Sequence, residues 1–459
     1  MIATEQLLTR RTIAQYAIGS LGTGGFATLP GLVLVYYLTD TLGVAALVAG
    51  VVVTVAKIWD VIIDPVIGAR SDRMLASRGT RRSMMMLGAI ALPVFFIVTF
   101  AVPPGTAAAP AAIWVLVAFV LTATAFSLFQ VPYIALPAEL ASGYDQRTRL
   151  LTWRVVVLTF AILLFGAGGP ALRSLGGDNE FAGYLLMAVV AGVVIGAGML
   201  VSSFVAPRGL PAAVLPPKES VLTTLRSNYA AGLRVLRDSQ PFRVLLLTFL
   251  LQGLATGAML AGANYVATWV LHSEDAVTFL FVALIGPALI VTPLWGVVSR
   301  RIGKERGFVL ASILFGLAAL SMIVLLWAPG PWVYLPVALV GAGYAGMQSL
   351  PMAMLPDVIS HDASVNGEGR AGTFGGMWTA GETTGMALGA TVLTIVLAVT
   401  GYVARTATPA VVAAGETQPA SAVAGIVLSF SLVPAGIVAL SLIPLARYRL
   451  RKEDIDGRL

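Results

Sequence analysis

The chain has 459 residues, of which only 11% are charged and 58% are hydrophobic, and its formal net charge is +7. These values exclude an ordinary soluble domain, in which about 25% of residues are charged, and a disordered chain, which has too little apolar surface to form a core. The sequence has no cysteine, which excludes disulfides, thiol catalysis and Cys-ligated metals. Its two histidines, His272 and His361, offer little for a histidine metal site.

Twelve apolar segments follow one another along the chain, and each is long enough to cross a bilayer as a helix of about 20 residues. The expected spans are 12–38, 43–69, 83–102, 111–138, 150–172, 182–206, 242–271, 276–299, 307–328, 331–356, 372–401 and 422–446. The expected fold is therefore an all-α membrane protein with twelve transmembrane helices.

A polar interruption at residues 207–241 is the longest break between spans, and it opens with a proline-rich stretch. It separates an N-terminal half of six helices, 1–206, from a C-terminal half of six helices, 242–459, which ends in a short cytoplasmic tail. We interpret 207–241 as a cytoplasmic linker. The expected architecture is two pseudo-symmetric six-helix halves.

The distribution of basic residues predicts the orientation, because cytoplasmic loops carry an excess of Lys and Arg. With both termini in the cytoplasm, 26 of the 29 Lys and Arg residues fall on the inner side, and two, Arg173 and Arg405, fall on the outer side. The net positive charge of the chain is then explained by its orientation in the membrane, so nucleic-acid binding is not expected. The expected location is the cell (inner) membrane, crossed many times.

The second span carries the sequence KIWDVIIDP, which places Lys57, Asp60 and Asp64 inside a membrane helix. An ionisable side chain at the centre of a span costs about 2.5–3.5 kcal/mol on insertion scales, so such residues mark functional sites. Asp60 and Asp64 are four residues apart and lie about 40° apart on one helix face. Two carboxylates so placed can share a proton or coordinate a small cation, and Lys57 can pair with one of them. The alternative is a structural ion pair that stabilises the span.

The loop after the second span, Gly68–Arg82, and the loop after the eighth, Gly296–Arg306, share the spacing G-x-x-S-[DR]-R. Repeated halves are typical of secondary transporters, in which the substrate site lies between the halves. The loops resemble the G-x-x-x-D-R-x-G-R-R pattern of the major facilitator superfamily, although the second copy has Arg where the pattern has Asp. The alternative is that both are simply basic cytoplasmic loops. The resemblance implies a gating loop at the cytoplasmic side formed by Asp72, Arg73, Arg81 and Arg82.

The eleventh span contains a further acid, Glu382, in the Gly- and Thr-rich sequence GMWTAGETTGMALG. No basic residue lies within one helical turn of it. We expect this carboxyl group to relay protons or to hold substrate. The alternative is a neutral carboxyl group hydrogen-bonded to a neighbouring helix.

Three segments carry a closer resemblance to a known family. They are YYLTDTLGVAALVAG with KIWDVIIDPVIGARSDR, then VPYIALPAELASGYDQRTRLLTWR, and finally MLPDVISHDASVNGEGRAGTFGGMWTAGETTGMALG. Together they resemble the glycoside–pentoside–hexuronide:cation symporter family, which includes the melibiose permeases. The family has W-D-A-x-x-D-P-x-x-G on helix 2 and P-Y-x-A-L-x-x-E-L-x-x-D-x-x-E-R-T after helix 4. The resemblance extends over nearly the whole chain.

In this family the two acids of helix 2 bind the coupling Na⁺, Li⁺ or H⁺, and Asp60 and Asp64 stand at their positions. The helix 4 hydroxyl that joins the cation site corresponds to Ser127, and Lys57 lies close by in the sequence. The helix 2 Asn that assists Na⁺ binding is replaced by Ile63. Since a metal ion needs several oxygen ligands and a proton needs one basic group, the resemblance favours H⁺. Na⁺ at Asp60 and Asp64 stays the alternative, and no resident cofactor or other metal is expected.

The sugar-binding residues of the family are changed further in this sequence. Gly24 and Gln130 replace two acids that grip sugar hydroxyls, Ile134 replaces a Trp that stacks on the sugar, and Thr383 replaces a helix 11 Lys. The helix 5 Arg is retained as Arg154. The resemblance therefore implies that the coupling residues are kept and the recognition residues are altered. Further substrate-binding candidates, each of which could equally be plain helix packing, are Tyr133, Trp378 and Glu382, with Trp153, Asn264, Tyr265 and Gln348 as other wall residues.

The leading hypothesis is a secondary active transporter that symports a sugar, glycoside or related small solute with a cation by alternating access. The alternative keeps the fold but makes the chain a lipid or lysolipid carrier or a proton-coupled exporter. An enzyme is not expected, because no nucleophile–base pair or metal cluster lies in a span and no nucleotide-binding P-loop is present. The expected partners are a small-molecule substrate and membrane lipid, and the expected oligomeric state is a monomer.

Overall fold

The computed structural model describes residues 8–140, 144–207, 221–273, 275–366, 371–405 and 417–450. Twelve of its helical segments are long and apolar enough to cross a membrane. They are Arg10–Thr41, Ala46–Arg78, Arg82–Phe100, Ala108–Pro137, Arg149–Ser174, Glu180–Ser203, Gln240–Val270, Ala276–Ile302, Lys304–Leu326, Pro331–Asp362, Thr373–Val399 and Ala420–Leu445. Each overlaps one expected span, so the predicted all-α fold with twelve transmembrane helices is confirmed, and the chain is a multi-pass membrane protein.

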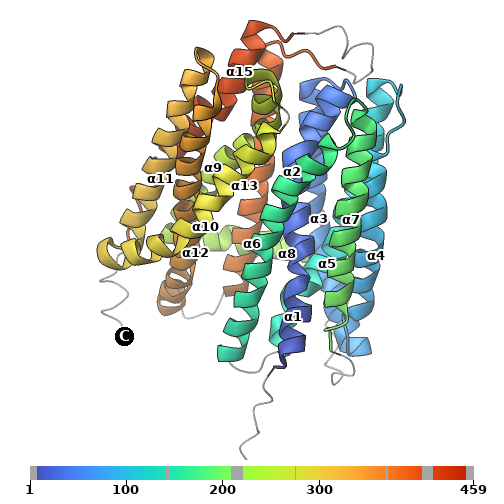
Figure 1. Cartoon of the computed structure of the whole chain (residues 1–459). Helices are drawn as coiled ribbons and strands as arrows, with labels where there is room; N and C mark the ends of the chain where they lie inside the picture. The colour runs from blue at the N-terminus through green and yellow to red at the C-terminus, as the bar shows by residue number, and fades with distance from the viewer. Residues whose placement is uncertain are drawn as a thin grey trace, which may run out of the picture. The chain divides into compact units, whose positions relative to one another are not determined.

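Unit 1 of the structure comprises Met1–Val44, Val55–Leu225 and Arg405–Gly415. Within it α4 packs against α5 and α7, and α2 packs against α6, as Figure 1 shows. The approach of α4 to α5 is close, because a Cβ atom on Gly88 would lie 2.5 Å from the carbonyl oxygen of Ala125. Its helices are α1 (Arg10–Ile18), α2 (Ser20–Tyr36), the π-helical turn η1 (Tyr37–Thr41), most of α3 (Ala46–Arg78), α4 (Arg82–Phe100), α5 (Ala108–Leu140), α6 (Tyr144–Ser174) and α7 (Glu180–Ser203).

Unit 2 comprises Ala45–Thr54, Arg226–Ala404 and Glu416–Leu459. In this unit α13 packs along α9, α12 packs against α10 and α11, and α16 packs against α9 and α11. The α9–α13 contact needs glycine, because a Cβ atom on Gly385 would lie 2.6 Å from the carbonyl oxygen of Leu250. Its elements are most of α8 (Val221–Asp238), α9 (Gln240–Tyr265), η2 (Val266–Val270), α10 (Ala276–Ile302), α11 (Lys304–Ser321), η3 (Met322–Leu326), η4 (Pro331–Val333), α12 (Tyr334–Asn366), α13 (Ala371–Val399), α15 (Ala420–Phe430) and α16 (Leu432–Leu445).

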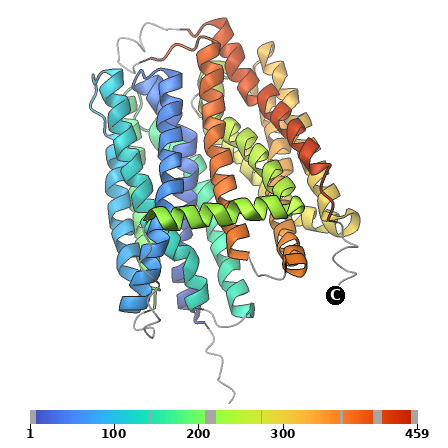
Figure 2. The same ribbon diagram turned by 180° about the vertical axis from the view of Figure 1, so that it is seen from behind.

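The two units follow the expected halves with two exchanges. The first nine residues of α3 belong to unit 2, and Arg405–Gly415 belongs to unit 1. Residues 208–220 of the expected linker lie outside the described residues, and the rest of it contains α8, which runs crosswise to α13 in Figure 2. The division at 207–241 stays a prediction.

The helix of the second span continues well past its expected end at residue 69. The sequence after that point is polar, yet it holds no helix breaker until Gly79, whose φ of 64° is in the left-handed region that favours glycine. The predicted gating loop is therefore mostly helix, with Asp72 and Arg73 in the last two turns of α3 and Arg82 at the start of α4.

The outward faces of the helices are apolar. Large side chains such as Leu247, Ile290 and Leu317 are exposed along their helices. In water such surfaces would promote aggregation, whereas in a bilayer they contact lipid tails.

Candidate cation and substrate sites

The acids of the second span lie together on α3 in unit 1. Lys57 Nζ is 3.2 Å from Asp60 Oδ2, and Asp64 accepts a hydrogen bond from Ser127 on α5. The second oxygens of the two acids, Asp60 Oδ1 and Asp64 Oδ1, are buried and accept no hydrogen bond from the described part of the chain. A buried carboxylate oxygen without a donor costs free energy, so a proton or a small cation would be stabilised here. The structure thus brings together the four residues expected at the cation site, and their role stays a prediction.

A hydrogen bond that the sequence did not reveal ties the acid-bearing helix to its neighbour. Trp59 Nε1 on α3 donates to Thr124 Oγ1 on α5 at 2.8 Å, and the Thr124 hydroxyl in turn donates to Val120 O of its own helix at 2.8 Å. Trp59 is next to Asp60, and Thr124 is one turn from Ser127. This bond therefore fixes the register of the two helices that supply the candidate cation ligands.

A second polar group in unit 1 joins α2, α5 and α6. Thr23 Oγ1 donates to Gln130 Oε1 at 2.7 Å, and the Tyr133 hydroxyl donates to Tyr16 O at 2.9 Å. The guanidinium carbon of Arg154 lies 5.4 Å from the centre of the Tyr133 ring. Arg154 makes no ion pair with any described residue, and its buried Nε has no hydrogen-bond partner among them. The expected residues Gln130, Tyr133 and Arg154 are thus neighbours, and Thr23 joins them, although a hydroxyl in a small-residue run gave no signal in the sequence.

The structure shows the surroundings of Gly24 and Ile134, two residues that replace sugar-binding residues of the family. A Cβ atom on Gly24 would lie 2.7 Å from Ala161 Cβ and 3.0 Å from Leu158 O, because α2 and α6 touch at this point. A carboxylate therefore does not fit at position 24 unless α6 moves. The side chain of Ile134 is 50% exposed on α5, so it presents an apolar surface where the family has an aromatic ring.

Two of the four predicted gating residues, Asp72 and Arg81, form an ion cluster with Glu139. The Arg81 guanidinium lies 2.6 Å from Asp72 Oδ1 and 2.6 Å from Glu139 Oε1, and it donates to Ser71 Oγ at 2.6 Å. Arg82 instead stacks on the ring of Phe204, with 4.1 Å between the guanidinium carbon and the ring centre. Arg73 lies beside Asp72 on α3.

The same arrangement recurs within unit 2. Lys304, at the start of α11, forms an ion pair with Asp357 near the end of α12 and donates to Ala353 O at 3.0 Å. Arg81 and Glu139 occupy the corresponding places in unit 1. Each unit therefore joins the loop after its second span to the end of its fourth span by a basic–acidic pair, which extends the repeated sequence pattern to a repeated contact.

Glu382 in unit 2 is the other expected membrane acid. It makes no hydrogen bond or ion pair with the described residues, and it lies near the hydroxyl of Tyr344 on α12. That hydroxyl accepts a hydrogen bond from Gln348 Nε2 at 3.0 Å. Trp378, one turn earlier on α13, is 3% exposed and stacks on Phe249 with 4.3 Å between ring centres. Its Nε1 is buried and finds no acceptor among the described residues, and a substrate role for Trp378 stays a prediction.

The remaining candidates are placed less favourably for substrate contact. The Thr383 hydroxyl donates to Thr379 O of its own helix at 2.9 Å. The Trp153 side chain is 51% exposed, whereas Asn264 and Tyr265 are fully buried on α9. Tyr265 packs edge-to-face on Tyr402 with 5.4 Å between ring centres. These contacts are those of helix packing, and a substrate role for the four residues stays untested.

Twelve spanning helices, a basic–acidic contact repeated in each unit and acids buried within a span define a secondary transporter. The chain matches the family described as MFS/sugar transport protein over residues 15–452, and it belongs to that family. The resemblance read from the helix 2 and helix 4 segments is thereby confirmed.

Known relatives match over nearly the full chain. The glucuronide carrier protein homolog of Escherichia coli strain K12 is 23% identical over 99% of this chain and 97% of its own length. The isoprimeverose transporter of Lactiplantibacillus pentosus is 23% identical over 95% of this chain and 88% of its own length. The crystal structure of a D-xylose–proton symporter superposes with a TM-score of 0.68 at 11% identity, over 97% of this chain and 98% of that one, which shows a common fold.

Proposed function

We propose that this protein is a cation-coupled symporter that moves a sugar, glycoside or related small solute by alternating access and carries out no enzymatic reaction. The observation that carries the proposal is the pair of acids on α3 with two buried oxygens, Asp60 Oδ1 and Asp64 Oδ1, that no described residue satisfies. A membrane protein retains such a costly pair where an ion or proton binds during its cycle. The family and the transporters among its relatives support the sugar part of the proposal.

The coupling ion that fits these residues best is H⁺. The ammonium group of Lys57 lies 3.2 Å from Asp60 and offsets its charge, so a metal ion beside it would meet electrostatic repulsion. The Ile63 side chain offers no oxygen, and among the described residues the hydroxyl that bonds to the acids is that of Ser127. A hard metal cation needs more oxygen ligands than this set supplies, whereas a proton needs only Asp64.

The substrate class that unit 1 favours is a sugar or glycoside with an acidic group. Gln130 replaces an acid of the family with a neutral amide, and Gly24 leaves no room for the other acid. The guanidinium of Arg154 is then a cation without an acidic partner in the described part of the chain. A guanidinium binds a carboxylate through two parallel hydrogen bonds, while Gln130 and Thr23 provide partners for hydroxyl groups.

The proposed orientation places both termini in the cytoplasm. The chain is proposed to cross the inner membrane of the cell and to act as a monomer. It rests on the strong excess of Lys and Arg on one side of the spans. The Arg81 cluster would then stabilise the cytoplasmic end of unit 1.

Uptake by purified protein in liposomes tests the proposal. The panel contains a glucuronide, a neutral glycoside and a lysophospholipid, each with an imposed H⁺ or Na⁺ gradient. We expect concentrative uptake of the glucuronide driven by H⁺, and Arg154→Lys should weaken glucuronide uptake more than uptake of the neutral glycoside. Transport of the lysophospholipid alone would establish a lipid carrier instead. Uptake that does not depend on either gradient would establish an uncoupled carrier.

A further inference from the structure

A buried acid lies at the end of the first span. Asp40 sits in the π-helical turn η1 and is fully buried. Its Oδ2 accepts a hydrogen bond from Thr39 Oγ1 at 2.7 Å, and its Oδ1 lies 3.5 Å from Arg405 Nε. Removing a carboxylate from water is costly unless a cation and hydrogen-bond donors replace the water, and Arg405 supplies that cation.

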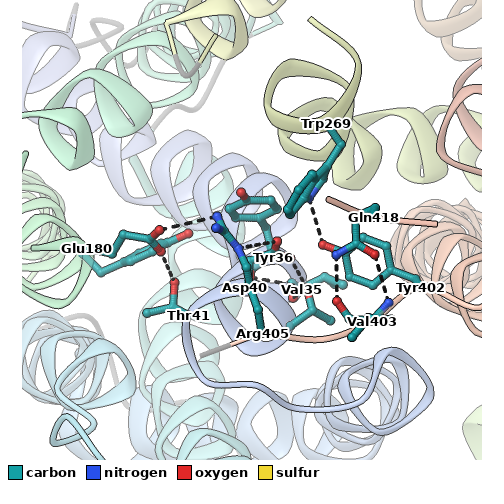
Figure 3. Close-up of polar contacts among 12 residues, drawn as sticks. Val35, Tyr36, Asp40, Thr41, Glu180, Trp269, Tyr402, Val403, Arg405 and Gln418 are labelled. Atoms are coloured by element: carbon teal, nitrogen blue, oxygen red, sulfur yellow. Dashed lines mark hydrogen bonds and ion pairs between the residues drawn. The ribbon is translucent and has the colours of Figure 1, made fainter. Parts of the chain in front are cut away.

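The same guanidinium serves a second acid. Glu180, at the N-terminus of α7, accepts a hydrogen bond from Thr41 Oγ1 at 2.8 Å and has its Oε1 3.6 Å from an Arg405 terminal nitrogen. Figure 3 shows Arg405 between Asp40 and Glu180. A planar guanidinium with five donors can hold two carboxylates at once, which a lysine cannot do with comparable geometry.

The other arginine of this region has a different anchorage. Arg173 belongs to α6 and is 6% exposed, with its guanidinium 5.4 Å from the ring centre of Tyr36 and a hydrogen bond of 3.2 Å to the Tyr184 hydroxyl. Arg173 and Arg405 are the two basic residues that the proposed orientation leaves outside. Arg173 lies within a helix, α6, whereas Arg405 lies in the segment that follows α13.

That segment has fixed contacts at both of its ends. Val403 and the Gln418 side chain exchange two hydrogen bonds, of 3.0 and 2.8 Å, and the Tyr402 hydroxyl accepts one from Trp269 Nε1 at 3.0 Å. All four residues belong to unit 2. Arg405 belongs to unit 1, where its backbone N–H donates to Thr39 O at 2.9 Å. Arg405 thus directly follows the last residues of a unit 2 segment in the chain, and it contacts two acids within unit 1, Asp40 and Glu180.

We propose that Arg405 is a latch of the transport cycle, docked on Asp40 and Glu180 while the carrier is closed to the outside and released when it opens outward. The proposal rests on the proposed transport function and its orientation. An ion pair suits this role because the cost of burying two charges nearly equals their mutual attraction, so docking and release differ little in free energy. Hydration of both acids would accompany release.

A thiol-labelling experiment tests the latch without any substrate. The native chain has no cysteine, so Ala27→Cys introduces a single reporter at an exposed α2 position between Thr23 and Asp40. A membrane-impermeant maleimide is added from outside. We expect a severalfold faster reaction when Asp40→Asn, Glu180→Gln and Arg405→Gln are added together, a combination that removes all three charges of the docked contact and leaves none of them unpaired. The charge-conserving Arg405→Lys should react at a rate nearer that of the parent. Equal rates in all three proteins would overturn the latch.

A cross-linking experiment tests whether release is required. The 2.9 Å hydrogen bond between the backbones of Thr39 and Arg405 places the two residues in direct contact, so cysteines at these positions are a suitable pair for cross-linking. We expect oxidation of the Thr39→Cys, Arg405→Cys protein to stop uptake and a reductant to restore it, with each single variant insensitive to oxidant. Full uptake by the cross-linked protein, or failure of the folded protein to cross-link, would contradict the latch. If the native protein transports none of the panel, the proposed function fails, and the labelling result still decides the latch.

Discussion

Trp59 on α3 and Thr124 on α5 are joined by a hydrogen bond of 2.8 Å between the indole Nε1 and the hydroxyl Oγ1. The bond lies beside Asp60 and one turn from Ser127, so it positions two helices that each supply part of the candidate cation site. We expect it to hold the distance between Asp64 and Ser127, since neither Trp59 nor Thr124 donates a hydrogen bond to the acids' free oxygens.

Replacing the acceptor in Thr124→Val should weaken both folding and coupling. The Trp59 N–H group would lose its partner, which costs about 1–3 kcal/mol in free energy of unfolding. Thermal unfolding in detergent and the apparent H⁺ affinity for uptake measure the two effects. Thr159→Val is the matched control, because the Thr159 hydroxyl bonds only to Val155 O of its own helix. Equal effects of the two variants would show that the Trp59 bond has no positioning role.

The Arg81 cluster should contribute strongly to the stability of unit 1. Arg81→Ala would leave Glu139 with a buried charge and no cation, and breaking such a pair costs about 3–5 kcal/mol. Adding Glu139→Gln should recover part of the loss, because the acid left without its cation is then Asp72, whose side chain is 62% exposed to solvent. The exposed Arg78, three residues earlier, gives the control Arg78→Ala, which should unfold like the native protein. A single-variant loss no larger than that of the control would contradict the assignment.

Replacing Gly24 and Gly168 by Ala should have opposite effects on the stability of the protein. Gly24→Ala brings a Cβ atom to 2.7 Å from Ala161 Cβ and 3.0 Å from Leu158 O, whereas Gly168→Ala meets nothing within 4 Å. Overpacking at position 24 should cost about 1–3 kcal/mol. Alanine at position 168 should stabilise α6 by about 1 kcal/mol, since glycine is the poorer helix former. The measurement is the unfolding midpoint of each variant relative to that of the native protein. Shifts in the same direction for both variants would contradict the close packing at Gly24.

The fold could be predicted because each span is a continuous apolar run, and a bilayer admits little besides helices for such runs. The acids of α3 could be predicted because a spacing of four residues fixes their common face within one helix. Ser127 was found only through the family motif, since its contact with Asp64 joins two helices.

Other contacts between different helices could not be predicted from the sequence either. Asp357 and Glu139 lie near the ends of α12 and α5, and their basic partners lie 53 and 58 residues away in the chain. Arg405 was visible only as an arginine on the unexpected side of the membrane. Such pairs depend on how helices pack, and periodicity along one helix carries no information about its neighbours.

We propose that Asp64 carries the coupling proton. The most direct measurement is the external pH of a weakly buffered suspension of proteoliposomes, without an imposed gradient, when a transported solute is added. We expect a transient rise in external pH with the native protein, as protons enter with the solute, and no rise with Asp64→Asn while solute still equilibrates. A rise of equal size with Asp64→Asn would show that Asp64 does not carry the proton.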